Sequence, residues 1–154
     1  MARLSGPART KAGQRRPAPL SDADYATLLA FRVELRRFLQ WSGAEASAVG
    51  LTATQHQLLL AIRGHPDQRG PTITDVAGYL LVRHHSAVEL VDRAEAAGLV
   101  QRRQDSEDLR VVRLVLTPAG ADKLGRLSVS HIEELRRLTP WLEALAGLGG
   151  AGRP

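Results

Sequence analysis

Apolar residues in the first third of the chain recur at the spacing of a helix. They are separated by three or four residues and comprise Leu28, Phe31, Leu35 and Phe38. This spacing places apolar side chains along one stripe of an α-helix. Ser21, with Asp24 three residues later, has the pattern of a capping box at the helix start. The pattern therefore predicts one amphipathic helix within residues 21–50, whose stripe needs other helices or a second chain to cover it.

The sequence pattern in the middle of the chain predicts three shorter helices. Capping-box patterns occur at Thr52 with Gln55 and at Thr72 with Asp75. Each places a hydroxyl at the N-cap and a side chain three residues on that reaches back to the N-cap backbone. A tight break near Leu81 separates the helix that begins at Thr72 from another helix between about His84 and Ala97. Gly98 then provides the stop signal.

After Gly98 the hydrophobic pattern changes from a helical to a strand period. Leu99–Arg103 and Arg110–Leu116 are predicted strands joined by a polar loop. Thr117 followed by Pro118 predicts the start of another helix, and a last apolar stripe is interrupted at Pro140. A short helix, a turn, a longer helix and a hairpin make a helix-turn-helix with a wing. The predicted fold class is mainly α with a small β-hairpin wing.

Composition and charge narrow the function classes. The chain has 154 residues and no cysteine, which excludes disulfide scaffolds, thiolate zinc sites and cysteine nucleophiles. Its 21 basic and 16 acidic residues give a formal charge of +5. Residues 1–20 carry five of the basic residues and no acid, so the remainder has 16 of each sign and is neutral. Charged residues interrupt every long apolar run, so we expect no membrane association and a cytoplasmic protein.

The predicted helix-turn-helix presents candidate DNA contacts. The second helix of such a motif enters the major groove with its N-terminal side chains against the base edges. In this chain those side chains are Arg83, His84, His85 and Ser86, and Glu89 lies one turn further on. The hairpin adds Arg110 and Arg113, which we expect to reach the flanking backbone or the minor groove. Asp108 is interpreted as an organiser of the wing.

The chain resembles the MarR family of winged helix-turn-helix transcriptional regulators over roughly residues 21–145. The resemblance rests on three segments in the family's order and spacing: Leu90–Val100, Asp108–Arg110 and Val115–Gly120. They match the family's Leu-Val-Asp-Arg-Leu-Glu helix end with Gly-Leu-Val, its Asp-x-Arg wing and its Leu-Thr-x-x-Gly helix start. Ala94 stands where the family usually has a large apolar residue.

The resemblance implies a homodimer that reads a pseudo-palindrome in double-stranded DNA, in many members as a repressor. It assigns minor-groove contact to Arg110, and recognition-helix contacts to residues 83–86 and to Glu89. It also implies a small aromatic or anionic effector, bound by position near Phe38, Trp41, His56 and Arg63. The implied division is a disordered basic tail at 1–20, an N-terminal dimerisation helix at 21–50, a DNA-binding domain at 51–117, C-terminal dimerisation helices at 118–146 and a flexible tail at 147–154.

Other interpretations remain open at this point. A winged-helix module that binds protein and no specific DNA fits the neutral charge of the body. Adjacent histidines point about 100° apart on a helix, so His84 and His85 favour groove contact over a metal site. Ser86, a histidine and Asp92 lack the strand-turn-helix context of a nucleophile. We therefore expect no enzyme activity, no cofactor and no metal. For Arg93, DNA contact and an ion pair with Asp108 or Glu89 are equally compatible.

Overall fold

The structure, a computed structural model, describes residues 19–148 of the chain. The elements in order are α1 (Asp22–Ala48), α2 (Ala53–Arg63), α3 (Ile73–Leu80), α4 (His84–Ala96), β1 (Val100–Gln104), β2 (Val112–Leu116), α5 (Pro118–Arg136) and α6 (Thr139–Ala146). Helices dominate and the two strands form one antiparallel hairpin, which confirms the predicted fold class. Nearly all of the predicted basic tail at 1–20, and the end of the tail at 147–154, lie outside the described residues.

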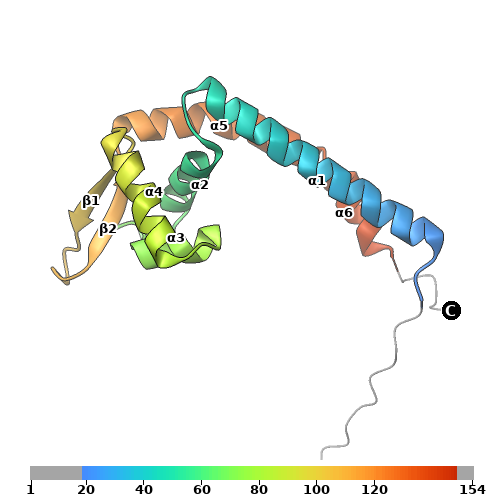
Figure 1. Cartoon of the computed structure of the whole chain (residues 1–154), viewed down its shortest axis with the longest axis horizontal. Helices are drawn as coiled ribbons and strands as arrows, with labels where there is room; N and C mark the ends of the chain where they lie inside the picture. The colour runs from blue at the N-terminus through green and yellow to red at the C-terminus, as the bar shows by residue number, and fades with distance from the viewer. Residues whose placement is uncertain (1–18, 149–154) are drawn as a thin grey trace, which may run out of the picture.

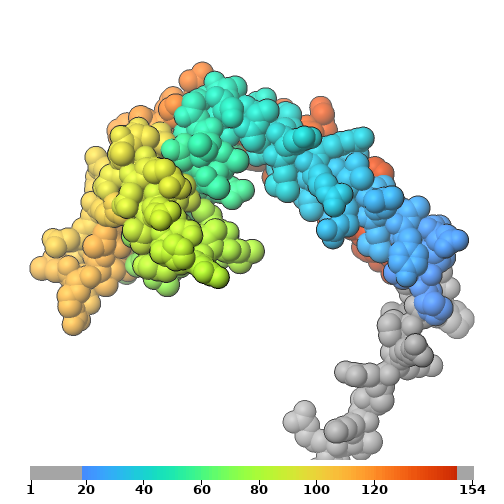
Figure 2. Space-filling view, in the orientation of Figure 1, coloured from blue at the N-terminus to red at the C-terminus, as the bar shows by residue number. Residues whose placement is uncertain are grey.

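The molecule consists of a long arm and a lobe (Figure 1). Helix α1 forms the arm, with α6 and part of α5 packed along it. Helices α2 to α4 and the hairpin form the lobe, and α5 runs from the hairpin to the arm. The space-filling view shows a hollow between α3 and the underside of α1 (Figure 2). Within residues 19–148, no helix combines the length and the apolar character needed to cross a bilayer.

The helix starts follow the predicted local signals. The capping boxes at Ser21 with Asp24, Thr52 with Gln55 and Thr72 with Asp75 are all present, each with both reciprocal hydrogen bonds. Thr117 caps α5 and Pro118 occupies its first turn. These interactions join residues three positions apart, so the sequence already contains both partners.

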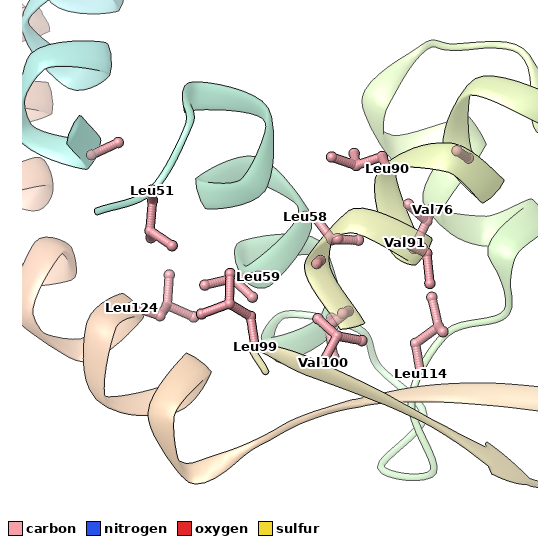
Figure 3. Packing of buried hydrophobic residues seen from close by; sticks show 14 of the residues in the cluster. Leu51, Leu58, Leu59, Val76, Leu90, Val91, Leu99, Val100, Leu114 and Leu124 are labelled. Atoms are coloured by element: carbon pink, nitrogen blue, oxygen red, sulfur yellow. The ribbon is translucent and has the colours of Figure 1, made fainter. Parts of the chain in front are cut away.

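The core of the lobe lies where α2, α4 and the hairpin meet (Figure 3). Leu58 and Leu59 of α2, Val91 of α4, Val100 of β1 and Leu114 of β2 have almost no exposed surface. Each such side chain contributes about 1.5–3 kcal/mol through burial, so this cluster fixes the recognition helix and the wing to one frame.

The second strand of the hairpin is shorter than predicted at the end that leads into the turn. Val100 pairs with Leu116 and Gln104 with Val112, whereas the predicted strands began at Leu99 and Arg110. The second strand begins later because the backbone between Asp105 and Val111 folds into its own turn, with the amide of Asp105 donating to the carbonyl of Val111 at 2.9 Å. This turn is the tip of the wing.

A third segment runs beside the hairpin. The amide of Leu114 donates to the carbonyl of Pro71 at 2.9 Å, just after Gly70. Gly70 has φ +92°, and a Cβ built on it would lie 2.1 Å from the carbonyl oxygen of Leu114. Only glycine allows the α2–α3 segment to approach β2 this closely.

Candidate nucleic-acid interface

The start of α4 is an exposed, positively charged helix N-terminus. Arg83 occupies the N-cap with β-region backbone and makes no side-chain cap hydrogen bond. Arg83, His84 and His85 are exposed, and Ser86 is half-buried. Because no side chain caps the first amides, these N–H groups and the positive end of the helix dipole are directed outward. The structure therefore brings these four predicted contact residues together at one end of α4.

The acidic residues along α4 are balanced by arginines. Glu89 lies 4.0 Å from Arg93 at the next turn, and both side chains are largely exposed. Arg102 of β1 contacts Asp92 at 2.6 Å and also pairs with Glu95. Of the partners considered for Arg93, the structure pairs it with Glu89. The carboxylates of α4 thus carry counter-charges that reduce their repulsion of an approaching polyanion.

The wing tip presents Arg110. Its side chain is 90% exposed, and Asp108 accepts hydrogen bonds from its backbone amide at 3.0 Å and from its Nε and Nη2 atoms at 3.1 Å each. The hydrogen bonds from Arg110 lower the pKa of Asp108, so this carboxylate stays ionised at neutral pH. Asp108 thus holds Arg110 in one orientation while leaving it open to solvent, which supports its interpretation as a wing organiser.

The base of the wing contains a charge network around the buried Asp105, and this network includes Arg113. Its side chain is 16% exposed, its Nε donates to Asp105 at 2.7 Å and its Nη1 donates to the carbonyl of Gly70 at 3.1 Å. The structure does not present Arg113 at the surface as the prediction of a DNA contact requires, because its guanidinium faces the interior and already has partners. Arg113 instead joins β2 to the α2–α3 segment.

Asp105 is the acceptor at the centre of this network. It is 3% exposed and accepts hydrogen bonds from the amides of Glu107 and Asp108 at 2.8 and 3.2 Å. The amide of Glu107 and then the side chain of Arg113 lower the pKa of Asp105 to about 2. Arg69 completes the network at 3.3 Å from Asp105. Sequence reasoning missed Asp105 and Arg69, because no local pattern links residues 36 positions apart.

An aromatic cluster lies between the arm and the lobe. Phe38 and Trp41 of α1 have ring centroids 6.0 Å apart, and His131 of α5 lies 4.7 Å from Trp41. His56 of α2 lies 4.5 Å from His131. Both histidines are buried. Three of the four predicted effector residues therefore meet, together with His131, which the sequence analysis missed.

Hydrogen bonds fix His131 within the cluster. Its Nδ1 lies 2.8 Å from the carbonyl of Leu127, and its Nε2 lies 2.8 Å from the hydroxyl of Ser42. The Leu127 carbonyl can only accept, so Nδ1 donates to it, and the Ser42 hydroxyl contacts the other ring nitrogen. Burial, and then the charge of His131, lower the pKa of His56. The cluster therefore favours an uncharged His56.

Arg63 does not join this cluster, which corrects the predicted effector set. It lies at the opposite end of α2 and lines a cavity of about 510 Å³ together with His65 and Gln68. Arg63 and His56 are seven residues apart, about 10 Å along the helix axis. That separation places the cation and the aromatic rings in different parts of the lobe.

Comparison with known proteins shows a similarity to one family over part of the chain. Residues 49–110 match the MarR family profile. This match confirms the resemblance to the MarR family. No curated protein matches the chain.

Solved structures of MarR regulators share the fold. A mutant of MepR from S. aureus, bound to an oligodeoxyribonucleotide, is 22% identical, with 75% of this chain and 82% of that chain covered and a TM-score of 0.59. AbsC from Streptomyces coelicolor is 20% identical, with 78% and 80% covered and a TM-score of 0.64. A MarR family regulator from Silicibacter pomeroyi is 26% identical, with 74% of each chain covered and a TM-score of 0.59.

The MarR match includes the exposed start of α4 and the wing tip as far as Arg110. It also includes both Asp105 and Arg69 at the base of the wing. Most of the aromatic cluster lies outside the matched residues, since Phe38 and Trp41 precede them and His131 follows them. The family match therefore bears on the candidate DNA interface more directly than on a ligand site.

Proposed function

We propose that this protein is a transcriptional regulator that binds a specific double-stranded DNA sequence as a homodimer. The observation that carries the proposal is the presence of two exposed arginines in one lobe: Arg83 at the N-terminus of α4, and Arg110 at the wing tip. A helix of this kind fits the major groove, and an exposed arginine on a wing fits the adjacent minor groove. The MepR structure bound to an oligodeoxyribonucleotide supports the assignment.

The apolar surface of the arm supports a homodimer. Exposed large apolar residues on α1, α5 and α6 include Tyr25, Leu29, Leu39, Val129, Ile132, Leu135 and Leu142. A surface with this many exposed apolar side chains is characteristic of an interface. We therefore assign α1, α5 and α6 to dimerisation and residues 51–117 to DNA binding. Two lobes in one dimer read half-sites about 34 Å apart.

We further propose that a small aromatic effector controls DNA binding. The rings of Phe38, Trp41, His56 and His131 join the arm to the lobe, so a flat aromatic ligand inserted among them moves α2 relative to α5. Such a movement changes the distance between the lobes of a dimer and releases DNA, as a repressor requires. A thermal-shift screen of aromatic acids, repeated with the Trp41→Ala variant, tests this; stabilisation that persists unchanged in the variant places the ligand elsewhere.

The main test is DNA binding by the wild-type protein and by Arg110→Ala. The probe is a duplex from the region upstream of the protein's own gene, and the readout is fluorescence anisotropy over a range of salt concentrations. We expect wild-type affinity to fall steeply with salt, and Arg110→Ala to bind more weakly with a salt slope reduced by about 1. Arg36→Ala, on the exposed surface of α1, is the matched control and keeps wild-type affinity.

A protein-interaction module is the alternative function, since the chain beyond residue 20 has no net charge. The same titration separates the two functions. Binding to DNA that is absent at low salt, or that does not depend on salt, contradicts the regulator and favours the interaction module. A footprint that covers a single half-site contradicts the dimer.

A further inference from the structure

The segment that joins β1 and β2 carries more negative than positive charge. Between β1 and β2 the chain has Asp105, Glu107 and Asp108, and Arg110 is the one basic residue there. An element that approaches DNA phosphates with such an excess is repelled unless its carboxylates are neutralised or held away. Some other part of the molecule must therefore counter these acids.

Arg69 lies close enough to two of these acidic residues to counter their charge. It belongs to the segment between α2 and α3, and its Nη1 donates to Glu107 at 2.6 Å and to Asp105 at 3.3 Å. Its Nε and Nη2 donate to Asp67 at distances of 2.8–3.1 Å. One guanidinium thus contacts carboxylates of its own segment and of the wing turn.

The ion pair between Arg69 and Glu107 controls where an exposed negative charge lies on the wing. The Glu107 side chain is 78% exposed, so without Arg69 its charge is free to move over the wing tip. Arg69 itself is only 37% exposed. The ion pair therefore orients the Glu107 carboxylate toward the segment between α2 and α3.

The Asp105 contact reaches Arg110 through the turn. Asp105 accepts from the amides of Glu107 and Asp108, and Asp108 in turn holds the guanidinium of Arg110. Arg69, Asp105, Asp108 and Arg110 thus form a continuous series of charge-assisted hydrogen bonds, which are stronger than neutral ones. These hydrogen bonds connect Arg69 to the residue that holds Arg110.

We propose that Arg69 is a positioning residue for DNA binding, which holds Glu107 away from the phosphates and fixes the turn that presents Arg110. This inference rests on the proposed DNA-binding function. Arg69 lies between α2 and α3, outside both the recognition helix and the wing tip. Arg69 acts through the wing, and does not itself contact DNA.

The first experiment compares Arg69→Ala with wild type on a duplex that the wild-type protein selects from random-sequence DNA. We expect the Kd to rise about tenfold, the size typical of coupling in a charged network. Arg69→Lys keeps the charge but loses the planar fork, so its Kd falls between the two. Arg37→Ala, which removes an arginine–glutamate pair from α1, is the control and leaves the Kd unchanged.

Two further variants separate positioning from a general effect on folding. Glu107→Gln in the Arg69→Ala background removes the released charge, so we expect it to recover part of the lost affinity. In a double-mutant cycle, Arg69→Ala and Arg110→Ala together should weaken binding by less than the sum of their separate effects, because part of the effect of Arg69 acts through Arg110. A loss of stability alone produces neither the rescue nor this non-additivity.

The outcomes distinguish the inference from the function on which it rests. If random-sequence DNA yields no selected duplex for the wild-type protein, the proposed function fails. If the wild type selects a duplex but Arg69→Ala binds it equally well, or if the effects of Arg69 and Arg110 add fully, the positioning role is wrong. If Arg69→Ala unfolds, Arg69→Lys takes its place, and its Kd is measured with and without Glu107→Gln. Recovery of affinity by Glu107→Gln supports the positioning role, and no recovery contradicts it.

Discussion

Replacement by alanine should have opposite effects on stability at two glycines of α5, Gly120 and Gly125. Gly120 lies in the first turn of α5, where its amide donates to the Thr117 hydroxyl at 3.0 Å. A Cβ built on Gly120 would lie 2.2 Å from the carbonyl oxygen of Leu99. For Gly125, further along the same helix, no atom of residues 19–148 other than its neighbours and the backbone of its own helix lies within 4 Å of the equivalent position. Alanine therefore fits at one position and collides at the other.

The magnitudes follow from helix propensity and from packing. Replacement of an exposed helical glycine by alanine stabilises a helix by about 1 kcal/mol, so we expect Gly125→Ala to gain this amount. Gly120→Ala must instead move the backbone at Leu99 by about 1 Å to reach ordinary contact. Overpacking of this kind costs about 1–3 kcal/mol or more, which exceeds the gain in propensity. The two variants should thus differ by about 2 kcal/mol or more in their free energy of unfolding.

Urea unfolding at one fixed protein concentration measures both variants. Fixed concentration matters because dimerisation makes apparent stability depend on it. We expect the midpoint to fall for Gly120→Ala and to rise for Gly125→Ala, with similar m-values. If Gly120→Ala is as stable as Gly125→Ala, then α5 does not approach Leu99 closely, and the placement of α5 on the hairpin is wrong.

Three further predictions concern His56, the core and a helix cap. Burial, and then the charge of His131, lower the pKa of His56, so the unfolded chain takes up a proton first as the pH falls below about 6.5. Stability should therefore decrease as the pH falls below about 6.5, and a His56→Gln variant that keeps this slope would refute the assignment. Leu59→Ala, at a fully buried position, should cost about 2–5 kcal/mol in chemical denaturation, whereas Leu60→Ala at a half-exposed position should cost much less. Thr72→Ala should lower the unfolding free energy by about 1 kcal/mol through loss of the cap of α3; no change would mean that the capping box contributes nothing.

The sequence determined the elements whose partners are close along the chain. Ser21, Thr52 and Thr72 each find their capping partner three residues later, so the starts of α1, α2 and α3 are readable without a structure. The order of these helices, with the hairpin after α4, was sufficient to predict the winged fold. The exposed residues at the start of α4 were also predictable, because the turn before α4 sets which side chains begin it.

Only the tertiary structure decided the roles of residues whose partners are remote in sequence. Arg113 and Arg110 look alike in the sequence, yet Arg113 faces Asp105 and the carbonyl of Gly70 while Arg110 faces solvent. Arg69 forms a hydrogen bond with Glu107, which lies 38 residues further along the chain. Ser42 forms one with His131, which lies 89 residues further along. Local patterns fix helices because capping and periodicity act over one or two turns, whereas an ion pair or a buried ring depends on which distant segments the core brings together.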